Sequence, residues 1–300
     1  MTSGRWCTLL FAPADRPDRV AKAFAAEPDG VIVDLEDAVQ PDQLAQARVN
    51  AAAALHAAPS NGPTRIVRVH SAQHVELTAD LDAVVGPALD VVMLPKTRRP
   101  RDVEDLDAAL SLREQAAGFA EGAIGIMPVL EDCYALRWVF EIATASERVS
   151  AMGFAGAEEG DFMADLGGRW TPDGLALQYA KSRFVSEVRA AGDVAAIDGP
   201  CMHLDSPEIL DSECALSRTL GFDGKVAVHP RQIPAIRLQF VPSSTEVERA
   251  TQLLEALERA AAAGAGVVRH QGMMVDSANA RSARRTLARA GRAWTGLDRA

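Results

Sequence analysis

Short apolar runs alternate with longer alanine-rich stretches eight times between Cys7 and Phe240. The short runs are rich in β-branched residues, which favour strands, and the longer stretches repeat their apolar residues with helical spacing. Repeated strand–helix units form a parallel sheet with helices packed outside it, so an α/β fold is predicted. The predicted strands are Cys7–Phe11, Gly30–Asp34, Arg65–Val69, Val91–Leu94, Ala123–Leu130, Val149–Phe154, Ala195–Ile197 and Lys225–Val228. The predicted helices are Pro17–Ala26, Gln43–Ala57, Leu77–Val85, Val103–Ala117, Ala135–Thr144, Ala176–Ala190, Ser206–Leu220 and Ile233–Phe240.

Eight strand–helix units are the number that closes a TIM (β/α)8 barrel. The main competitor is an open, doubly wound sheet, but no G-x-G-x-x-G motif follows the first strand and no P-loop lysine motif occurs. Beyond the eighth unit come a helix at Thr245–Ala263, a strand-like segment at Val267–Val275 and a basic helix at Ser277–Ala290. A closed barrel does not need them for its core. We therefore expect a barrel domain at residues 1–242 and a helical C-terminal extension or lid at residues 243–300, which caps the barrel or reaches a neighbouring subunit.

Composition argues against several classes of protein. The net charge of −10 is unlike that of a general nucleic-acid-binding protein, which normally carries a basic surface. No apolar run approaches the ~20 residues of a membrane-spanning helix, and the N-terminus lacks the pattern of a signal peptide, so a cytoplasmic location is expected. The four cysteines are far apart and form no C-x-x-C pair, which predicts buried thiols without a zinc site or disulfide framework.

Acidic residues follow three of the apolar runs. Glu36 and Asp37 come after the second predicted strand, Glu131 and Asp132 end the fifth, and Asp161 comes after the sixth. The carboxyl ends of parallel strands meet at one face of the fold, so these side chains are expected to converge. Carboxylate oxygens are the ligands that Mg²⁺ prefers, which makes Glu131 and Asp161 candidate ligands. For Asp37 and Asp132, capping of a helix start is an equally good explanation.

Three basic residues lie at the same predicted face. Arg68 stands in a buried strand and needs an anion, which is either a partner carboxylate from Glu36 or Asp37 or the carboxylate of a substrate. Lys96 follows the fourth strand, where a phosphate or structural contact is favoured over a Schiff base. Arg16, at the first strand-to-helix turn, suits phosphate recognition but also an ordinary surface position.

A series of motifs in a fixed order resembles the citrate lyase β-subunit-like family of CoA-ester lyases, which includes malyl-CoA and citramalyl-CoA lyases. Each motif is weak alone, but the ordered set is specific and spans nearly the whole chain. The motifs are Phe11-Ala-Pro-Ala-Asp-Arg-Pro-Asp-Arg19, Val33-Asp-Leu-Glu-Asp-Ala-Val39, Leu94-Pro-Lys96, Asp161-Phe-Met-Ala-Asp-Leu-Gly167, Ala196-Ile-Asp-Gly199, Gly221-Phe-Asp-Gly-Lys225, His229-Pro230 and Met274-Val-Asp276.

The resemblance implies a homotrimeric or homohexameric enzyme that cleaves a 3-hydroxyacyl-CoA to an acyl-CoA and a 2-keto acid through a Mg²⁺-stabilised enolate. Glu131 and Asp161 match the family's metal ligands, and Arg68 matches the arginine that holds the keto-acid carboxylate. Asp276 matches an acid/base aspartate that is delivered across a subunit boundary. The family's acidic second-strand site corresponds to Glu36 and Asp37. The candidate contacts to CoA are Arg16, Lys22, Lys96, His229 and Pro230.

Two segments depart from the family's usual pattern. The segment from Phe154 to Asp161 is longer and carries Glu158 and Glu159, which leaves the metal ligand open among these three acids. The segment Asp198–His203 differs from the aromatic and acidic run expected there, which leaves the acyl group open. A thioesterase acting on a malyl-CoA-type ester and a non-catalytic subunit of the same fold therefore remain alternatives, with membership of a citrate lyase complex less favoured.

Overall fold

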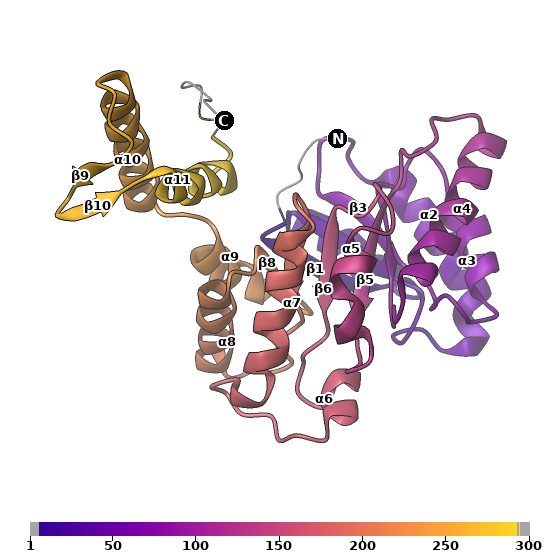
Figure 1. Ribbon diagram of the computed structural model, residues 1–300. Coiled ribbons are helices and arrows are strands. Elements are labelled where there is room, and N and C mark those ends of the chain that lie inside the picture. Colours follow the sequence, from indigo (N-terminus) through magenta and orange to yellow (C-terminus); the bar gives the residue numbers. More distant parts are fainter. Residues whose placement is uncertain (1–5, 293, 295–300) are drawn as a thin grey trace. The chain divides into compact units, whose positions relative to one another are not determined.

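The computed structural model describes residues 6–292 and residue 294, and it divides the chain into two compact units, Met1–Leu238 and Gln239–Ala300. In the first unit eight parallel strands close into a barrel, in which each strand pairs with the next and the eighth returns to the first (Figure 1). The predicted TIM barrel is confirmed. The strands are β1 (Thr8–Pro13), β2 (Gly30–Asp34), β3 (Thr64–Arg68), β4 (Val91–Leu94), β5 (Gly125–Leu130), β6 (Ala151–Phe154), β7 (Ala195–Asp198) and β8 (Gly224–Ala227).

Helices follow the strands around the outside of the barrel (Figure 1). Their starts follow from local chemistry, because proline presets the helical φ angle and needs no N–H partner in the first turn. α1 begins at Pro17 and α4 at Pro100. The helices are α1 (Pro17–Ala25), α2 (Leu44–Ala57), α3 (Leu77–Val84), α4 (Pro100–Ala117), α5 (Val139–Ala143), α6 (Asp161–Leu166), α7 (Gln178–Ala190), α8 (Pro207–Leu220) and α9 (Ile233–Phe240). Short 3-10 turns, η1 (Pro41–Gln43), η2 (Ala135–Trp138), η3 (Leu175–Leu177) and η4 (Pro230–Gln232), precede four of them.

Apolar side chains from all the strands fill the barrel interior. Leu9, Ile32, Ile66 and Met127 are among those buried there. Successive side chains of a strand point to opposite faces, so a residue two positions beyond an interior residue points to the same side. Arg68 is two positions beyond Ile66, at the last position of β3. The alternation that builds the core therefore also delivers this arginine to the carboxyl end of the barrel.

The second unit contains α10 (Ser244–Ala262), β9 (Val268–His270), β10 (Met273–Val275) and α11 (Ser277–Arg289). Its two helices pack through Val247, Leu254 and Leu287. A single strand-like segment was expected at Val267–Val275, and this expectation is wrong, because β9 and β10 form an antiparallel hairpin. The two turn residues, Gln271 and Gly272, have φ angles of 47° and 85°, as in the turns that suit the twist of a hairpin.

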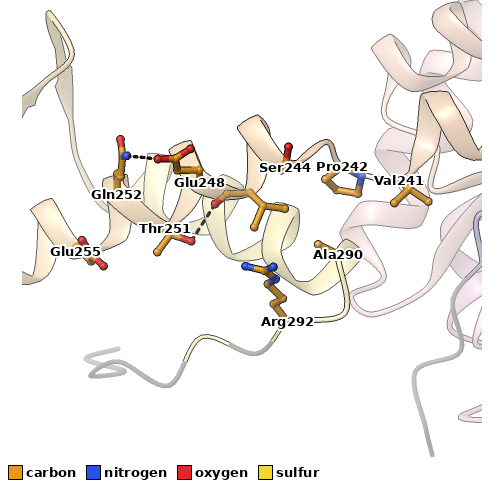
Figure 2. A pocket seen from close by; sticks show the side chains of 10 residues that line it. Val241, Pro242, Ser244, Glu248, Thr251, Gln252, Glu255, Ala290 and Arg292 are labelled. Carbon is orange, nitrogen blue, oxygen red and sulfur yellow. Dashed lines mark hydrogen bonds between the residues drawn. The ribbon is translucent and has the colours of Figure 1, made fainter.

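A groove of about 520 Å³ lies within the second unit (Figure 2). Glu248 and Thr251 of α10 line it together with Arg292, which follows α11. Across the described part of the chain, no helix is long and apolar enough to span a bilayer.

Candidate active site

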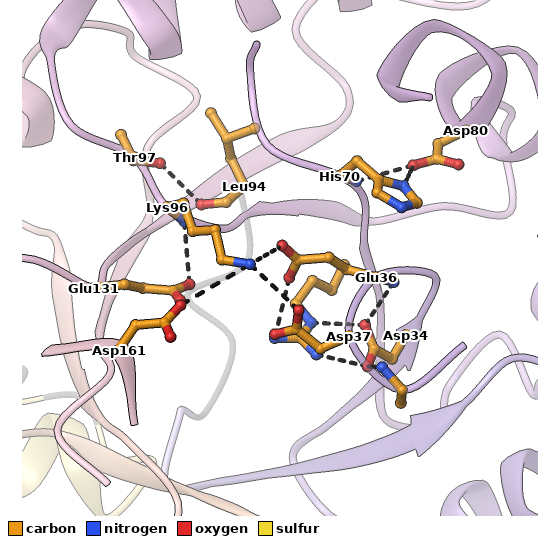
Figure 3. Close-up of polar contacts among 12 residues, drawn as sticks. Asp34, Glu36, Asp37, His70, Asp80, Leu94, Lys96, Thr97, Glu131 and Asp161 are labelled. Atoms are coloured by element: carbon orange, nitrogen blue, oxygen red, sulfur yellow. Dashed lines mark hydrogen bonds and ion pairs between the residues drawn. The ribbon is translucent and has the colours of Figure 1, made fainter. Parts of the chain in front are cut away.

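Charged side chains from five consecutive barrel segments meet at the carboxyl end of the strands (Figure 3). Five are carboxylates and two are cations, so each cation has several acidic neighbours. β2 and the loop after it contribute three acids, β3 and β4 lead to the two cations, and β5 and α6 bring the last two acids. These residues are Asp34, Glu36, Asp37, Arg68, Lys96, Glu131 and Asp161. The convergence predicted from their positions after strands is therefore present in the fold.

Arg68 is held by a carboxylate that the sequence did not single out. Its Nε and Nη2 atoms each donate to Asp34 at 2.6 Å, in a bidentate pair, because Asp34 and Arg68 are register partners on β2 and β3. Nη1 of Arg68 makes longer contacts, 3.3 Å to Glu36 and 3.5 Å to Asp37. Burial of the guanidinium opposes its charge, but the bonds from Asp34 outweigh burial and raise the pKa of Arg68. Arg68 therefore stays charged, with one nitrogen only loosely held.

Lys96 contacts the acidic side chains through its backbone N–H and through its side-chain ammonium group. Its backbone N–H donates to Glu131 at 3.1 Å, and its Nζ lies 2.8 Å from Glu36 and 3.3 Å from Asp37. The residue has a φ angle of 50°, a left-handed conformation that is costly for a lysine and is typical of functional sites. Burial lowers the pKa of Lys96, but the bond and charge of Glu36 outweigh it and leave the pKa raised. A permanently protonated ammonium is a poor nucleophile, which speaks against a Schiff base.

Glu131 and Asp161 provide a donor set that fits Mg²⁺. Glu131 is only 8% exposed, and burial, reinforced by the charge of Glu36, raises its pKa to about 7. Asp161 is exposed and its carboxylate lies 4.0 Å from Nζ of Lys96. Within the described residues, no group of three or more His, Cys, Asp or Glu side chains has metal-binding geometry. A magnesium ion here would take these two carboxylates and fill its remaining positions with water and substrate, which is how proteins usually bind it.

The neighbouring acids have other partners. Oε2 of Glu158 lies 2.5 Å from Nε2 of His203. Of the three candidate ligands Glu158, Glu159 and Asp161, Asp161 is the one that pairs with Lys96 of the cluster. Asp132 accepts the N–H of Ala135 at 2.7 Å and also pairs with an arginine, as expected of a capping residue. These contacts favour Asp161 as the metal ligand on this loop.

The candidate contacts to CoA follow β1 and β8, which are neighbours in the barrel. Arg16 precedes the first turn of α1 and lies 3.8 Å from Asp18, and Lys22 is exposed on the same helix. His229 accepts the N–H of Arg231 at 3.1 Å, and Pro230 begins η4. Lys96 stands apart from this group, in the acidic cluster after β4. The role of each of these residues toward CoA stays a prediction.

Asp276 lies in the second unit, where it caps α11. Its Oδ1 accepts the N–H of Ala278 at 2.8 Å, and its own N–H donates to Asn279 at 2.9 Å. The carboxylate is exposed at the end of the β9–β10 hairpin. The cap fixes its direction on the second unit, and its expected part in proton transfer stays a prediction.

A histidine that the sequence did not single out follows Arg68 by two positions. Its Nδ1 lies 2.7 Å from the fully buried Asp80, which also accepts the N–H of the same His70 at 2.9 Å. Arg48 donates to Asp80 at 2.9 Å. This network ties the chain after β3 to α2 and α3 (Figure 3). The period-two spacing of Ile66, Arg68 and His70 was the only available signal for it.

Known proteins are similar to this chain along most of its length. Residues 7–230 match the family model described as HpcH/HpaI aldolase/citrate lyase. The citrate lyase subunit beta of Haemophilus influenzae is 33% identical over 270 residues, which cover 90% of this chain and 91% of that protein. Two proteins of Cereibacter sphaeroides are each 31% identical: an L-malyl-CoA/beta-methylmalyl-CoA lyase, with 91% of each chain covered, and a (3S)-malyl-CoA thioesterase, with 94% of each covered.

A solved structure extends the likeness to three dimensions. CitE from Mycobacterium tuberculosis, in complex with magnesium, acetoacetate and coenzyme A, is 32% identical to this chain and matches its fold with a TM-score of 0.73. The match covers 96% of this chain and 99% of that one. With a family model over most of the sequence and relatives above 30% identity along nearly its full length, the chain belongs to the HpcH/HpaI aldolase/citrate lyase family and is a lyase of that family.

Proposed function

We propose that this protein is a Mg²⁺-dependent carbon–carbon lyase that cleaves a 3-hydroxyacyl-CoA of the malyl-, citramalyl- or citryl-CoA type to an acyl-CoA and a 2-keto acid. The observation that carries the proposal is that Glu131, Asp161 and Arg68 belong to one cluster at the carboxyl end of the barrel: Lys96 contacts Glu131 and Asp161, and Glu36 links Lys96 to Arg68. The two carboxylates suit a hard cation, which can bind the carbonyl oxygen and carboxylate of a 2-keto acid. The charged guanidinium can bind the same carboxylate directly. The magnesium, keto acid and coenzyme A in the related CitE support the same assignment.

The reaction requires two proton movements. The hydroxyl group on C3 loses its proton and becomes the carbonyl of the keto acid as the C2–C3 bond breaks. The electron pair of that bond passes to C2, beside the thioester, and C2 then takes a proton to give the acyl-CoA. Bound Mg²⁺ supplies positive charge to the oxygens of the keto acid during this change.

The residues of the chain divide the remaining work between them. Arg68 binds the keto-acid carboxylate through Nη1, since its other donors are already held by Asp34. Glu36 contacts both Arg68 and Lys96 and, with Asp37, keeps the two cations in place. Burial raises the pKa of Glu36 against the opposing effect of Arg68, so its charge is sensitive to what binds beside it.

Proton transfer depends on the oligomeric state, because the residue that transfers the proton comes from another subunit. Asp276 transfers the proton at C2 from a neighbouring subunit, in a homotrimer or homohexamer. Arg16, Lys22, His229 and Pro230 hold the CoA portion at the adjoining ends of β1 and β8. The protein acts without nucleic acid or membrane partners, in the cytoplasm.

A substrate panel tests the proposal. Purified protein is incubated with malyl-, citramalyl-, β-methylmalyl- or citryl-CoA, with Mg²⁺ or with EDTA, and the CoA species and keto acids are separated. We expect one ester to yield equal amounts of acyl-CoA and glyoxylate, pyruvate or oxaloacetate, only with Mg²⁺. Neither keto acid nor free CoA from any ester, in protein that binds Mg²⁺, would instead support a non-catalytic subunit.

A thioesterase is the second candidate, because the (3S)-malyl-CoA thioesterase is as similar to this chain as the malyl-CoA lyase is. The two activities differ in the bond that breaks. Release of free CoA together with an intact hydroxy acid identifies the thioesterase in the same panel.

A further inference from the structure

We propose that His203 is a positioning residue for Asp161. Its imidazole binds Glu158 and so fixes the conformation of the metal loop, residues 155–160, in which the carboxylate of Asp161 lies in the cluster. The two side chains are called the Glu158–His203 clasp below. The inference rests on the proposed function in one respect, namely that Asp161 ligates the metal. It adds two residues outside the charged cluster to the machinery that makes the site.

The metal loop has a conformation that its own sequence does not favour. It ends in a tight turn, in which the N–H of Gly160 donates to the carbonyl of Ala157 at 3.1 Å. Glu159, inside this turn, has a φ angle of 59°, where a side chain with a Cβ is strained. Such strained residues persist only when the surroundings fix them. Asp161 is the first residue of α6, directly after the turn, so the direction of its carboxylate depends on what fixes the turn.

The supporting loop, residues 199–206, contacts the metal loop at two separate points. At Gly199 the two backbones touch, because a Cβ there would lie 2.8 Å from the carbonyl oxygen of Phe154 and 3.1 Å from the nitrogen of Gly156. Four residues later, Nε2 of His203 lies 2.5 Å from Oε2 of Glu158, inside the turn. Two contacts along one pair of loops fix both position and direction.

His203 and the supporting loop around it are fixed by contacts with other parts of the barrel unit. The indole of Trp170 stacks on its imidazole, with centroids 5.4 Å apart and an angle of 28° between the rings. In the supporting loop the carbonyl of Cys201 accepts from the buried side chain of Gln232 at 2.9 Å. The same Gln232 accepts the N–H of Val228 at 2.9 Å, which ties the supporting loop to the end of β8. A fixed His203 can therefore hold the less constrained metal loop.

Asp161 has little else to hold it. Its side chain is 62% exposed, and its one ion-pair distance, 4.0 Å to Lys96, is at the limit of a contact. α6 has only six residues, although its buried Phe162 anchors it to the core. Without the clasp the turn relaxes and Asp161 samples directions away from Glu131. This weakens the metal site.

Calorimetric titration with Mg²⁺ alone, without substrate, tests the clasp. The variants are His203→Ala, Glu158→Ala and the double variant, with Asp205→Ala as the matched control. Asp205 lies in the same supporting loop, but its side chain is 96% exposed, and its one ion pair within the described residues is with Arg231, at 3.0 Å. We expect each single variant to weaken Mg²⁺ binding about 5-fold and the double variant to be no worse than either, because both remove one interaction. The control should stay within about 2-fold of the wild type.

Amide hydrogen exchange of the metal-free protein provides a readout that does not depend on metal binding. Residues 156–165 should exchange about 5-fold faster in both single variants, and His203→Gln, which keeps a donor for Glu158, should recover most of the protection. If the wild type binds no Mg²⁺, the proposed metal site fails, and the exchange data alone decide the clasp. Unchanged exchange, or additive losses of affinity in the double variant, would overturn it.

Discussion

At the residue scale, the pair of Arg68 and Asp34 shows which part of the site the sequence could give. An arginine in a buried strand had to have an anion, and that expectation is confirmed. The expected partners, Glu36 and Asp37, do contact Arg68, at 3.3 Å and 3.5 Å, but the short bidentate contact comes from Asp34, which was not expected. Strand register decides this, since Asp34 faces Arg68 across β2 and β3. Register is set by the closed barrel and cannot be read from either strand alone.

Replacement of Arg68 by lysine tests its role in substrate recognition. Lysine keeps the charge but, with a single nitrogen, cannot hold Asp34 through two donors and present a third, Nη1, to the substrate. We expect kcat/KM for the preferred CoA ester to fall about 100-fold, with changes in both KM and kcat, as for the loss of a bond to a charged group in the transition state. Steady-state kinetics at saturating Mg²⁺ measure this. Kinetics that stay at the wild-type level would make Arg68 a structural partner of Asp34 only.

The raised pKa of Glu131 predicts how metal binding depends on pH. Burial of this carboxyl raises its pKa to about 7, and the metal requires the ionised form. Mg²⁺ affinity should therefore fall about 10-fold for each pH unit below 7 and level off above it. Titrations at several pH values measure this, and an affinity that is constant between pH 5.5 and pH 8, as rough limits, contradicts the prediction.

The same group affects the stability of the metal-free protein with the opposite sign. Because folded Glu131 binds its proton more tightly than unfolded Glu131, the contribution of this group to stability should be largest at acidic pH and should fall by up to about 3 kcal/mol as the pH rises to 7. Urea denaturation in EDTA measures this slope. In Glu131→Gln, which cannot ionise, the contribution should disappear.

At the element scale, segments with a clear apolar pattern of their own were predictable even when short, and segments without such a pattern were not. β2 and β4 begin and end where the alternation predicted, and α9 does as well. α6 was missed, because a helix of six residues offers less than two turns of periodicity. The hairpin of β9 and β10 was read as one strand, because its turn, Gln271-Gly272, is only two residues long. A helix or a turn of so few residues does not produce a periodic pattern that can be recognised in the sequence.

A buried ion cluster joins β7 and β8 to the helices outside them. Asp198, at the end of β7, lies 2.9 Å from Nζ of Lys181 on α7 and 2.7 Å from Nζ of Lys225 on β8. Lys225 also lies 2.8 Å from Glu213 on α8. Burial disfavours the charge of Asp198, but the two lysines outweigh it and hold its pKa well below the ordinary range. The cluster therefore stabilises the fold only while Asp198 is ionised.

Asp198→Asn should destabilise the protein strongly. It leaves two buried ammonium groups with one carboxylate, which costs about 3–5 kcal/mol. The contribution of Asp198 is present above the pKa of an unfolded aspartate and is lost as the pH falls through its lowered folded value, so wild-type stability should decline in acid. Urea denaturation of both proteins at neutral and acidic pH measures this. A variant as stable as the wild type at neutral pH contradicts it.

At the scale of the whole molecule, the barrel and its family could be predicted from the sequence, and the ordered motifs spanned nearly the entire chain. The motifs left open which acid near the metal loop is the ligand. The contact that bears on this question joins Glu158 to His203, and His203 follows a different strand from Asp161. The division into Met1–Leu238 and Gln239–Ala300 lies near the expected boundary. That the active site is shared between subunits stays a proposal.

Complementation between subunits tests the shared site. Oligomers mixed from Asp276→Ala and Glu131→Gln chains contain some sites with a wild-type metal ligand and a wild-type aspartate from the neighbour. We expect each parent to be inactive and the mixture to regain about a quarter of wild-type activity after random exchange of subunits, if each chain works independently. Native mass spectrometry confirms exchange. A fully exchanged mixture that stays inactive places Asp276 in its own chain's site.

The proposed magnesium-dependent carbon–carbon cleavage at Glu131 and Asp161 is tested most directly by the product stoichiometry during a Mg²⁺ titration with the preferred ester. In the wild type, acyl-CoA and keto acid should rise together in equal amounts and vanish with EDTA. In Glu131→Gln and Asp161→Asn, both products should fall at least about 100-fold while circular dichroism shows an intact fold, because a catalytic metal supplies several kcal/mol of stabilisation. Undiminished formation of both products by these two variants, or by the wild type in EDTA, would contradict the claim.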